Sequence, residues 1–353
     1  MAEFEVTYVS VGHGDATLIK VPGGHYVLVD VYRCPGQGID LFKLLDDVLP
    51  DGDDGRKRLE VLAITHAHDD HIAGIGDLYD RYQIGELWLP QHGEKLQTVA
   101  GNYEDFKRIQ DEHPEEQKLW PKGSRSVWNS LGDNGEVVVR CFSPPGFIDP
   151  EEELDEEEAK RFVHENCVVL KFTYAGYSVM LTGDSNKACW ERIVGYYEGR
   201  TDDVGLEVLR AESLHASHHG SRTFVKDGED DEPDLKALNL IEPEHVVISV
   251  GPDSQYDHPH DDMVHIYNNA VDPENVLETH KIGTIRLEIE SDGVARLITD
   301  DGPTYEQAYS WDDDGDDSNG DARTRRRSVP PAAPPPGFER TPQRGPRRDR
   351  YAG

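Results

Sequence analysis

Cysteine is rare in this sequence: four occur in 353 residues, and none belongs to a CxxC pair. A disulfide-stapled scaffold or a cysteine-rich zinc module has closely and regularly spaced cysteines, so this spacing favours neither. We interpret the four as ordinary buried or partly buried thiols, with a disulfide or a cysteine-based zinc site as the alternative. They are Cys34, Cys141, Cys167 and Cys189.

Long apolar runs are absent as well. No stretch approaches the roughly 18 apolar residues that a membrane helix requires. The chain begins MAEFEVTYVSVG, in which apolar and polar residues alternate as they do in a β-strand. An export signal would instead place a charged segment before an apolar one. We therefore expect a cytoplasmic protein that makes no contact with a membrane.

Positive charge is scarce relative to negative charge. The sequence has 36 lysines and arginines against 70 aspartates and glutamates, for a formal net charge of −34. Such a surface repels phosphate backbones at long range, which argues against a high-affinity nucleic-acid binder. It remains compatible with an enzyme whose local field is set by bound cations.

The composition changes near residue 311. Residues 311–353 hold an acidic block, then a Pro/Ala run and clustered arginines, with almost nothing that could enter a core. We predict that this tail is disordered. It serves either as a passive solubilising segment or, because acids precede bases, as a segment that docks to an acidic or other partner.

Residues 1–310 predict a single α/β domain. Strands come first, then alternate with helices, and then return, an order that fits two mixed β-sheets packed face to face with helices outside. Among the predicted elements are a long strand at Val208–Ser217 and a continuous helix at Ile72–Tyr82. Two polar insertions interrupt this order, at about 93–134 and 149–161. We expect the first to cover one edge and the second to be a solvated charged face.

The segment THAHDDHI contains the strongest chemical signal. Its metal-binding candidates, placed on a loop between a strand and a helix, are His66, His68, Asp70 and His71. Imidazole and carboxylate suit Zn²⁺ or Mn²⁺, and the first two histidines can converge on one ion while the aspartate and the last histidine serve a second. Two ions about 3.5–4 Å apart can share a hydroxide. A solvated His-rich turn is the alternative, but three of 16 histidines within six positions disfavour it.

The same segment resembles a known family. HAHDDH matches the HxHxDH signature of the metallo-β-lactamase superfamily completely, and with further motifs before and after it the resemblance spans residues 4 to about 290. VGHGDA resembles the VGQGDA opening of the branch related to the hydrolase domain of the ComEC/Rec2 competence proteins, with His13 in place of Gln. SHHGS resembles the HHGS motif of that branch, and YDHPH resembles its YGHP segment, with Asp257 in place of Gly.

This resemblance implies an αβ/βα four-layer sandwich that holds two divalent metal ions. Asp184, in a TGD motif after a strand, would bridge both ions; a helix cap is its alternative role. His218 and His219 are adjacent, and on an extended segment their side chains would point in opposite directions. We therefore expect only one of them to bind metal, and we favour His219.

The resemblance leaves one ligand unassigned. The third histidine that the family usually places before the bridging aspartate has no clear counterpart here. His164 stands near that point but beside Asn166, and we do not count it among the predicted ligands. One ion is then expected to be held by fewer protein groups and more weakly.

Further residues are expected around the ligands. Asp30, Asp15 and Asn166 are predicted to support the metal-binding loops. The alternatives are a strand-end turn residue for Asp30 and a loop hydrogen-bond acceptor for Asp15. His258 and His260 flank Pro259, and one of them would protonate the leaving group or contact a phosphate. A polar turn is the alternative for this pair.

We expect a metal-dependent hydrolase, and phosphodiester hydrolysis is the leading function. In this hypothesis Asp70 and Asp184 hold a hydroxide between the two ions, and the hydroxide attacks phosphorus. The competence proteins carry their hydrolase domain beside a membrane channel that this sequence lacks, so a role in DNA import does not carry over. The substrate would be DNA, a nucleotide or a smaller phosphoester. The alternatives are a carboxyl-ester or thioester hydrolase and a catalytically degenerate binding or regulatory module.

Overall fold

Two mixed β-sheets form the centre of the protein in a computed structural model, which describes residues 3–34, 36–90, 102–147, 150, 154–198, 205–252 and 256–299. The first sheet has eight strands in the order β15-β14-β1-β2-β3-β4-β5-β6. The second has seven strands in the order β13-β12-β11-β10-β9-β8-β7. The predicted disordered tail, 311–353, lies outside the described residues, as does the predicted domain boundary at residue 310.

The strands of the first sheet are β1 (Phe4–Tyr8), β2 (Thr17–Val21), β3 (His25–Val29), β4 (Arg58–Ala63), β5 (Gln83–Trp88), β6 (Lys118–Leu119), β14 (Ile285–Ile289) and β15 (Ala295–Thr299). Those of the second sheet are β7 (Asn129–Leu131), β8 (Val137–Ser143), β9 (Val169–Tyr174), β10 (Tyr177–Leu181), β11 (Ser213–His215), β12 (His245–Ile248) and β13 (Val276–Glu278). β3 to β6 run parallel to one another, and so do β10 to β13; the remaining pairs are antiparallel.

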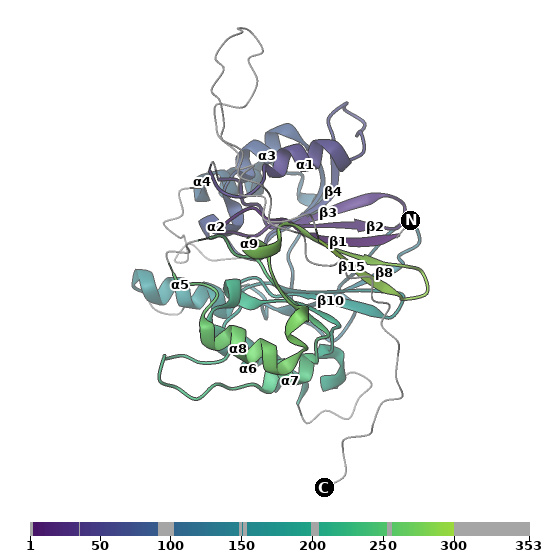
Figure 1. Cartoon of the computed structure of the whole chain (residues 1–353). Helices are drawn as coiled ribbons and strands as arrows, with labels where there is room; N and C mark the ends of the chain where they lie inside the picture. The colour runs from purple at the N-terminus through teal and green to yellow at the C-terminus, as the bar shows by residue number, and fades with distance from the viewer. Residues whose placement is uncertain are drawn as a thin grey trace, which may run out of the picture.

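Helices cover the outer face of each sheet. The helices of the described chain are α1 (Leu41–Val48), α2 (Asp69–Ile72), α3 (Ile75–Arg81), α4 (Tyr103–Glu112), α5 (Glu156–Glu165), α6 (Lys187–Tyr197), α7 (Lys236–Ile241), α8 (Asp261–Ala270) and α9 (Thr279–Ile282). Figure 1 shows α1, α3 and α4 above the first sheet and α6, α7 and α8 below the second, which gives the four layers predicted from the sequence. In the part of the chain that the structure describes, every helix is too short or too polar to cross a membrane.

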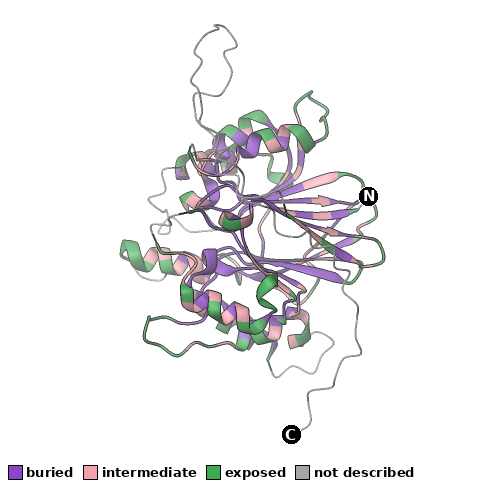
Figure 2. Ribbon diagram, viewed as in Figure 1, coloured by how far each residue is buried: buried purple, intermediate pink, exposed green. Residues whose placement is uncertain are grey.

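Apolar burial explains this layering. One cluster of buried side chains fills the space between the sheets, and two others fill the spaces between each sheet and its helices. β1 alternates buried and partly buried residues. All five residues of β10 are buried because both faces of this strand are covered, one by the cluster between the sheets and the other by the cluster under the helices. Figure 2 shows the buried strands at the centre and exposed residues on the outward sides of the helices.

The structure corrects several predicted elements. The helix expected at Ile72–Tyr82 is two helices, α2 and α3, which are separated at Gly74 because this residue adopts a left-handed φ of 89°. The strand expected at Val208–Ser217 is only the short β11, preceded by a 3₁₀ helix. In the predicted insertion at 93–134, the described residues supply β6 and β7, so they extend both sheets rather than cover one edge.

Candidate metal centre

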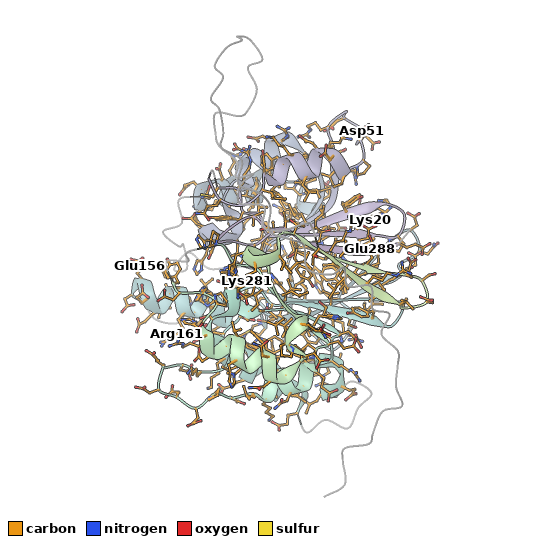
Figure 3. The ribbon with its side chains drawn as sticks, viewed as in Figure 1. Lys20, Asp51, Glu156, Arg161, Lys281 and Glu288 are labelled. Atoms are coloured by element: carbon orange, nitrogen blue, oxygen red, sulfur yellow. The ribbon has the colours of Figure 1, made fainter. Side chains whose placement is uncertain are left out.

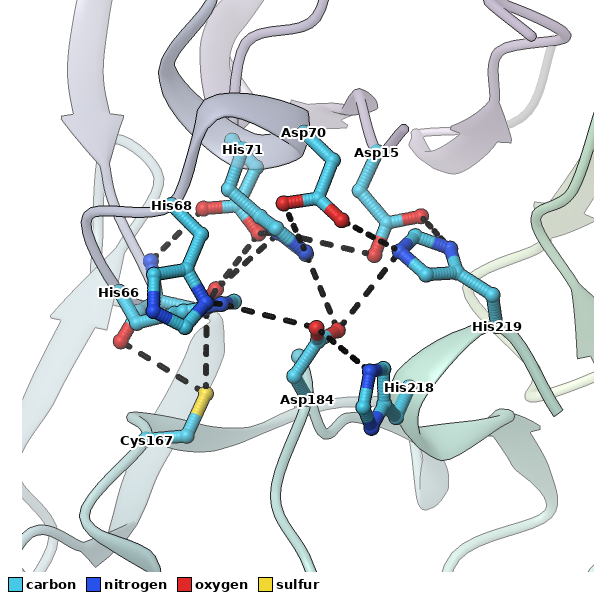
Figure 4. A network of polar contacts seen from close by, with 12 residues as sticks. Asp15, His66, His68, Asp70, His71, Cys167, Asp184, His218 and His219 are labelled. Carbon is cyan, nitrogen blue, oxygen red and sulfur yellow. Dashed lines mark hydrogen bonds and ion pairs between the residues drawn. The ribbon is translucent and has the colours of Figure 1, made fainter. Parts of the chain in front are cut away.

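The candidate site lies at one edge of the sandwich, where loops from both sheets meet. β3 and β4 are parallel, so Asp30 and the THAHDDH segment follow them at the same edge. β10 and β11 are parallel as well, and Asp184 and the HHGS segment follow them. The site expected from the sequence therefore assembles from segments that are more than 100 residues apart, as Figure 4 shows.

A first set of donor atoms contains three imidazoles and one carboxylate. The Nδ1 atom of His68 lies 3.1 Å from Nε2 of His66 and 3.0 Å from Nε2 of His164. Oδ2 of Asp184 lies 3.6 Å from each of the latter two nitrogens. These four residues form one group with metal-ligand spacing. Four ligands arranged tetrahedrally around Zn²⁺ would stand about 3.3 Å apart, so this spacing fits a cation.

A second set lies on the other side of the same carboxylate. Oδ1 of Asp184 is 3.0 Å from Nε2 of His71 and 3.8 Å from Nε2 of His219. Asp70 approaches both rings, with Oδ1 3.9 Å from His71 and Oδ2 3.5 Å from His219. Asp184 is 1% exposed and contributes one oxygen to each set, which places it where a bridging ligand would stand.

Hydrogen bonds fix which ring nitrogens point at the cluster. His71 donates Nδ1–H to Oδ2 of Asp30 at 2.8 Å, and His219 donates Nδ1–H to the carbonyl of Ser249 at 2.8 Å. Nε2 is then the atom through which each ring would bind a cation, in place of a proton. Asp30 also accepts hydrogen bonds from the Thr65 amide and hydroxyl, both at 2.7 Å. These hydrogen bonds tie Asp30 to the THAHDDH segment.

Polar atoms without partners provide an independent test of this interpretation. Nε2 of His71, Nε2 of His219 and Oδ1 of Asp184 are buried and have no hydrogen-bond partner in the described structure. Burying such atoms unsatisfied costs free energy, and all three face one another. These unsatisfied atoms all belong to the second set and fit a cation there, whereas the first set is supported by its donor chemistry and spacing.

Electrostatics points the same way. Burial alone raises the pKa of Asp184, but the surrounding His218, His71 and His66 outweigh it and hold the pKa well below its usual range. Burial lowers the pKa of His71, yet Asp184, Asp30 and Asp70 raise it well above the ordinary value. Clustered carboxylates thus demand positive charge at the centre of the site.

The HHGS segment differs from the sequence prediction. His218 and His219 are not extended: both lie in the left-handed region, with φ of 50° and 53°. The sequence prediction assumed an extended segment, and that assumption was wrong. Nε2 of His218 lies 3.5 Å from Oδ2 of Asp184, and its Nδ1 lies 3.0 Å from the Thr223 hydroxyl. Both rings face the cluster, and His219 belongs to the second set. Left-handed non-glycine residues often mark functional sites.

His164 is the residue that the sequence reasoning missed. It lies in the last turn of α5, a helix that begins inside the predicted insertion at 149–161. Its side chain is the fourth member of the first set. Asp155 and Glu158 cap the start of this helix through a capping box. Figure 3 shows Glu156 and Arg161 extending outward from it. The sequence did offer one clue: Asp155-x-x-Glu158 is a capping-box pattern, which predicts a helix that begins there and includes His164. The insertion is therefore more than a charged face.

The remaining predicted residues lie around the cluster. Asn166 ends α5 and donates its side-chain amide to the carbonyl of Phe162. Asp15 is 4% exposed and lies behind both ligand rings of the second set, 3.8 Å from Nδ1 of His71 and 3.7 Å from Nδ1 of His219. Its backbone N–H donates to the carbonyl of Asp70 at 2.9 Å. Asp15 thus ties the VGHGDA loop to the metal loop.

His258 and His260 lie at the outer side of the site. The ring of His258 is 5.1 Å from that of His218, between centroids. Burial, followed by the neighbouring His219 and His260, lowers the pKa of His258 to about 4. Nδ1 of His260 accepts the backbone N–H of Arg222 at 3.1 Å, so the ring proton of neutral His260 is on Nε2.

An αβ sandwich with a shared His/Asp cluster at its edge defines a class of metal-binding folds. The model of the metallo-beta-lactamase superfamily matches residues 9–227, and the chain therefore belongs to this superfamily, whose members are mostly metal-dependent hydrolases that hold two divalent metals. ComE operon protein 3 of Bacillus subtilis is 22% identical over 295 residues, which are 81% of this chain. The chain spans about a third of that relative, since the match covers 33% of its length.

Solved structures of the same fold include YhfI of Bacillus subtilis and the short form of human tRNase Z. YhfI is 13% identical and matches 84% of this chain and 100% of its own, with a TM-score of 0.43. The human tRNase Z is 13% identical and matches 70% of this chain and 93% of its own, with a TM-score of 0.37. The diiron β-hydroxylase CmlA of Streptomyces venezuelae is 14% identical, matches 85% of this chain and 54% of its own, and has a TM-score of 0.44.

Proposed function

We propose that this protein is a metal-dependent phosphodiesterase. One observation carries the proposal: the two oxygens of Asp184 face two separate donor sets, so the chain offers a place for two cations side by side. Paired cations suit phosphodiester cleavage because they can neutralise charge on both the attacking and the leaving oxygen.

Each set has a distinct chemical character. The first set has three imidazoles and one carboxylate and suits Zn²⁺. The second set has the imidazoles of His71 and His219 with the carboxylates of Asp70 and Asp184, and it accommodates Zn²⁺ or Mn²⁺. Divalent cations held there would lower the pKa of a water molecule toward neutrality and polarise a phosphoryl oxygen.

The side chains around the cluster have separate tasks in this proposal. Asp184 and Asp70 would help to hold the cations, and their carboxylates would position the attacking water. His258, whose ring adjoins that of His218, lies where it can offer an N–H to the leaving oxygen. The fixed tautomer of His260 keeps its Nε2–H available as a hydrogen-bond donor to a phosphate oxygen.

The resemblance of the VGHGDA and HHGS segments to the competence-protein branch supports phosphoric esters over other substrates. The net charge of −34 disfavours long nucleic acids, so a nucleotide or a short strand is the better candidate. We keep cleavage of a carboxyl ester or thioester as an outcome of the test, because the same cluster polarises a carbonyl equally well.

The test is an assay of the purified protein, loaded with Zn²⁺ or Mn²⁺, on bis(4-nitrophenyl) phosphate, a 4-nitrophenyl carboxylate and a thioester. We expect cleavage of the phosphodiester and its loss in His68→Ala. Asp133→Asn, a change at an exposed carboxylate that binds His25, is the matched control and should retain activity. Turnover of the carboxyl ester or thioester without turnover of the phosphodiester would overturn the proposal.

A further inference from the structure

A short row of aromatic rings leads from the metal cluster to solvent. The ring of His258 lies 6.2 Å from that of His219, and the two planes are inclined by only 28°. Tyr256 follows, with its ring 6.0 Å from His258 and inclined by 35°. Asp257 between them adopts a left-handed φ of 56°, a conformation that aspartate tolerates better than most residues.

Tyr256 is one of few strongly exposed aromatic residues in the described chain. It is 65% exposed, with Phe147 at 60% and Tyr196 at 44%, whereas Tyr8, Tyr82, Tyr197 and Tyr267 are all at most 1% exposed. Leaving an apolar ring in contact with water is unfavourable in free energy compared with burying it. Tyr256 lies at the outer end of the row, next to His258, to which we assign the leaving oxygen, so a substrate group could contact its exposed ring.

We propose that Tyr256 is a stacking platform for the base of the leaving nucleoside, so that the substrate is a nucleoside phosphodiester. This inference rests on the proposed phosphodiesterase function, because it takes its orientation from His258 at the leaving oxygen. The base attached to the leaving sugar then lies beyond His258, over the ring of Tyr256. Tyr256 is a specificity-determining residue in this account and takes no part in bond cleavage.

The charge of the protein makes such a contact useful. With 70 acidic residues against 36 basic ones, long-range attraction for a phosphate backbone is weak. Stacking of a base on an aromatic ring does not depend on net charge and accepts any base. The chain can therefore bind a nucleotide through the cations and one aromatic contact, without a basic surface.

The experiment crosses one protein change with one substrate change. The substrates are a dithymidine phosphodiester and the same molecule without the base on its leaving sugar. We expect Tyr256→Ala to raise KM for the intact dinucleotide by about 5- to 150-fold, the range that removal of a stacked ring produces, with kcat little changed. The same variant should leave KM for the base-free substrate unchanged. Tyr256→Phe, which keeps the ring, should behave like the wild type.

A matched control is available on the second sheet's outer helices. Tyr196 on α6 is 44% exposed and lies beside Arg125, so Tyr196→Ala removes a comparable exposed ring elsewhere. It should leave both KM values unchanged. Equal effects of Tyr256→Ala on both dinucleotides, or no effect on either, would overturn the stacking role.

The outcomes also separate this inference from the proposed function. If bis(4-nitrophenyl) phosphate is cleaved but the dinucleotide is not, the phosphodiesterase proposal stands and the nucleoside inference fails. If neither is cleaved by metal-loaded protein, both fail.

Discussion

Replacement of Asp30 by asparagine tests how the chain prepares its metal ligands. Asp30 is buried and accepts three hydrogen bonds, from the Thr65 amide, the Thr65 hydroxyl and Nδ1 of His71. In Asp30→Asn the Thr65 amide still requires an oxygen acceptor, so the new NH₂ group faces His71. Nδ1 of His71 must then accept, and its proton moves to Nε2, the atom that faces Asp184.

The magnitude follows from this change of tautomer. Changes to groups that orient metal ligands cost about 10- to 100-fold in metal affinity, which corresponds to about 1.4–2.8 kcal/mol. The loss should fall mainly on the second cation, because His71 belongs to that set. In addition, a hydrogen bond to a charged carboxylate is replaced by one from a neutral amide, so the metal-free protein should be less stable by about 1 kcal/mol.

The assay is a titration of metal-free protein with Zn²⁺ and Mn²⁺ in competition with a chelator, followed by calorimetry. Thr65→Val is a related variant: the Thr65 hydroxyl donates to Asp30 and lies 3.2 Å from Nδ1 of His66, so this change should weaken both cations. Asp133→Asn on the surface should change neither affinity. An Asp30→Asn protein that binds both cations as tightly as the wild type would refute the reasoning.

Three further predictions concern the scaffold. Arg192→Ala removes a 2.5 Å hydrogen bond to the carbonyl of Glu165 at the end of α5; amide hydrogen exchange in α5 should increase and the first cation should bind more weakly, and unchanged exchange would count against this. Gly183→Ala places a Cβ at φ 47° and 2.6 Å from the sulfur of Cys167, so urea unfolding should show a loss of about 2–4 kcal/mol, and an unchanged midpoint would contradict it. Burial lowers the pKa of His245 from 6.5 to about 4. A base with a lowered folded pKa stabilises the protein above the unfolded pKa, and this contribution of about 3 kcal/mol is lost as pH falls from 6.5 to 4. His245→Asn should therefore flatten the unfolding curve over that window; an unchanged slope would show that His245 is not responsible.

The local parts of the site were predictable from sequence. His66, His68, Asp70 and His71 lie within six residues, so their spacing alone brought them together as a candidate cluster. The two-sheet architecture followed from the order of strands and helices. The helix boundary did not: Asp70 and His71 lie inside α2 rather than on a loop, because the helix begins at Asp69. A four-residue helix is too short to produce a detectable hydrophobic periodicity.

The parts that depend on tertiary contacts were harder to predict. His164 lies on a helix with one fully buried residue, Val163, so its apolar pattern is weak, and the contact with His68 spans 96 residues. The left-handed backbone at His218 and His219 contradicts the preference of non-glycine residues and is imposed by the surrounding contacts, including the hydrogen bond from the His218 amide to the carbonyl of Gly183. Local propensities cannot reveal such a turn.

The most direct measurement is the number of divalent cations bound per chain, determined by elemental analysis after equilibrium dialysis of the wild type and of Asp184→Ala. The chain should hold two cations, and removal of the one carboxylate that faces both donor sets should weaken both of them together. A wild type that retains no cation, or an Asp184→Ala protein that retains two with unchanged affinity, would contradict the shared metal centre.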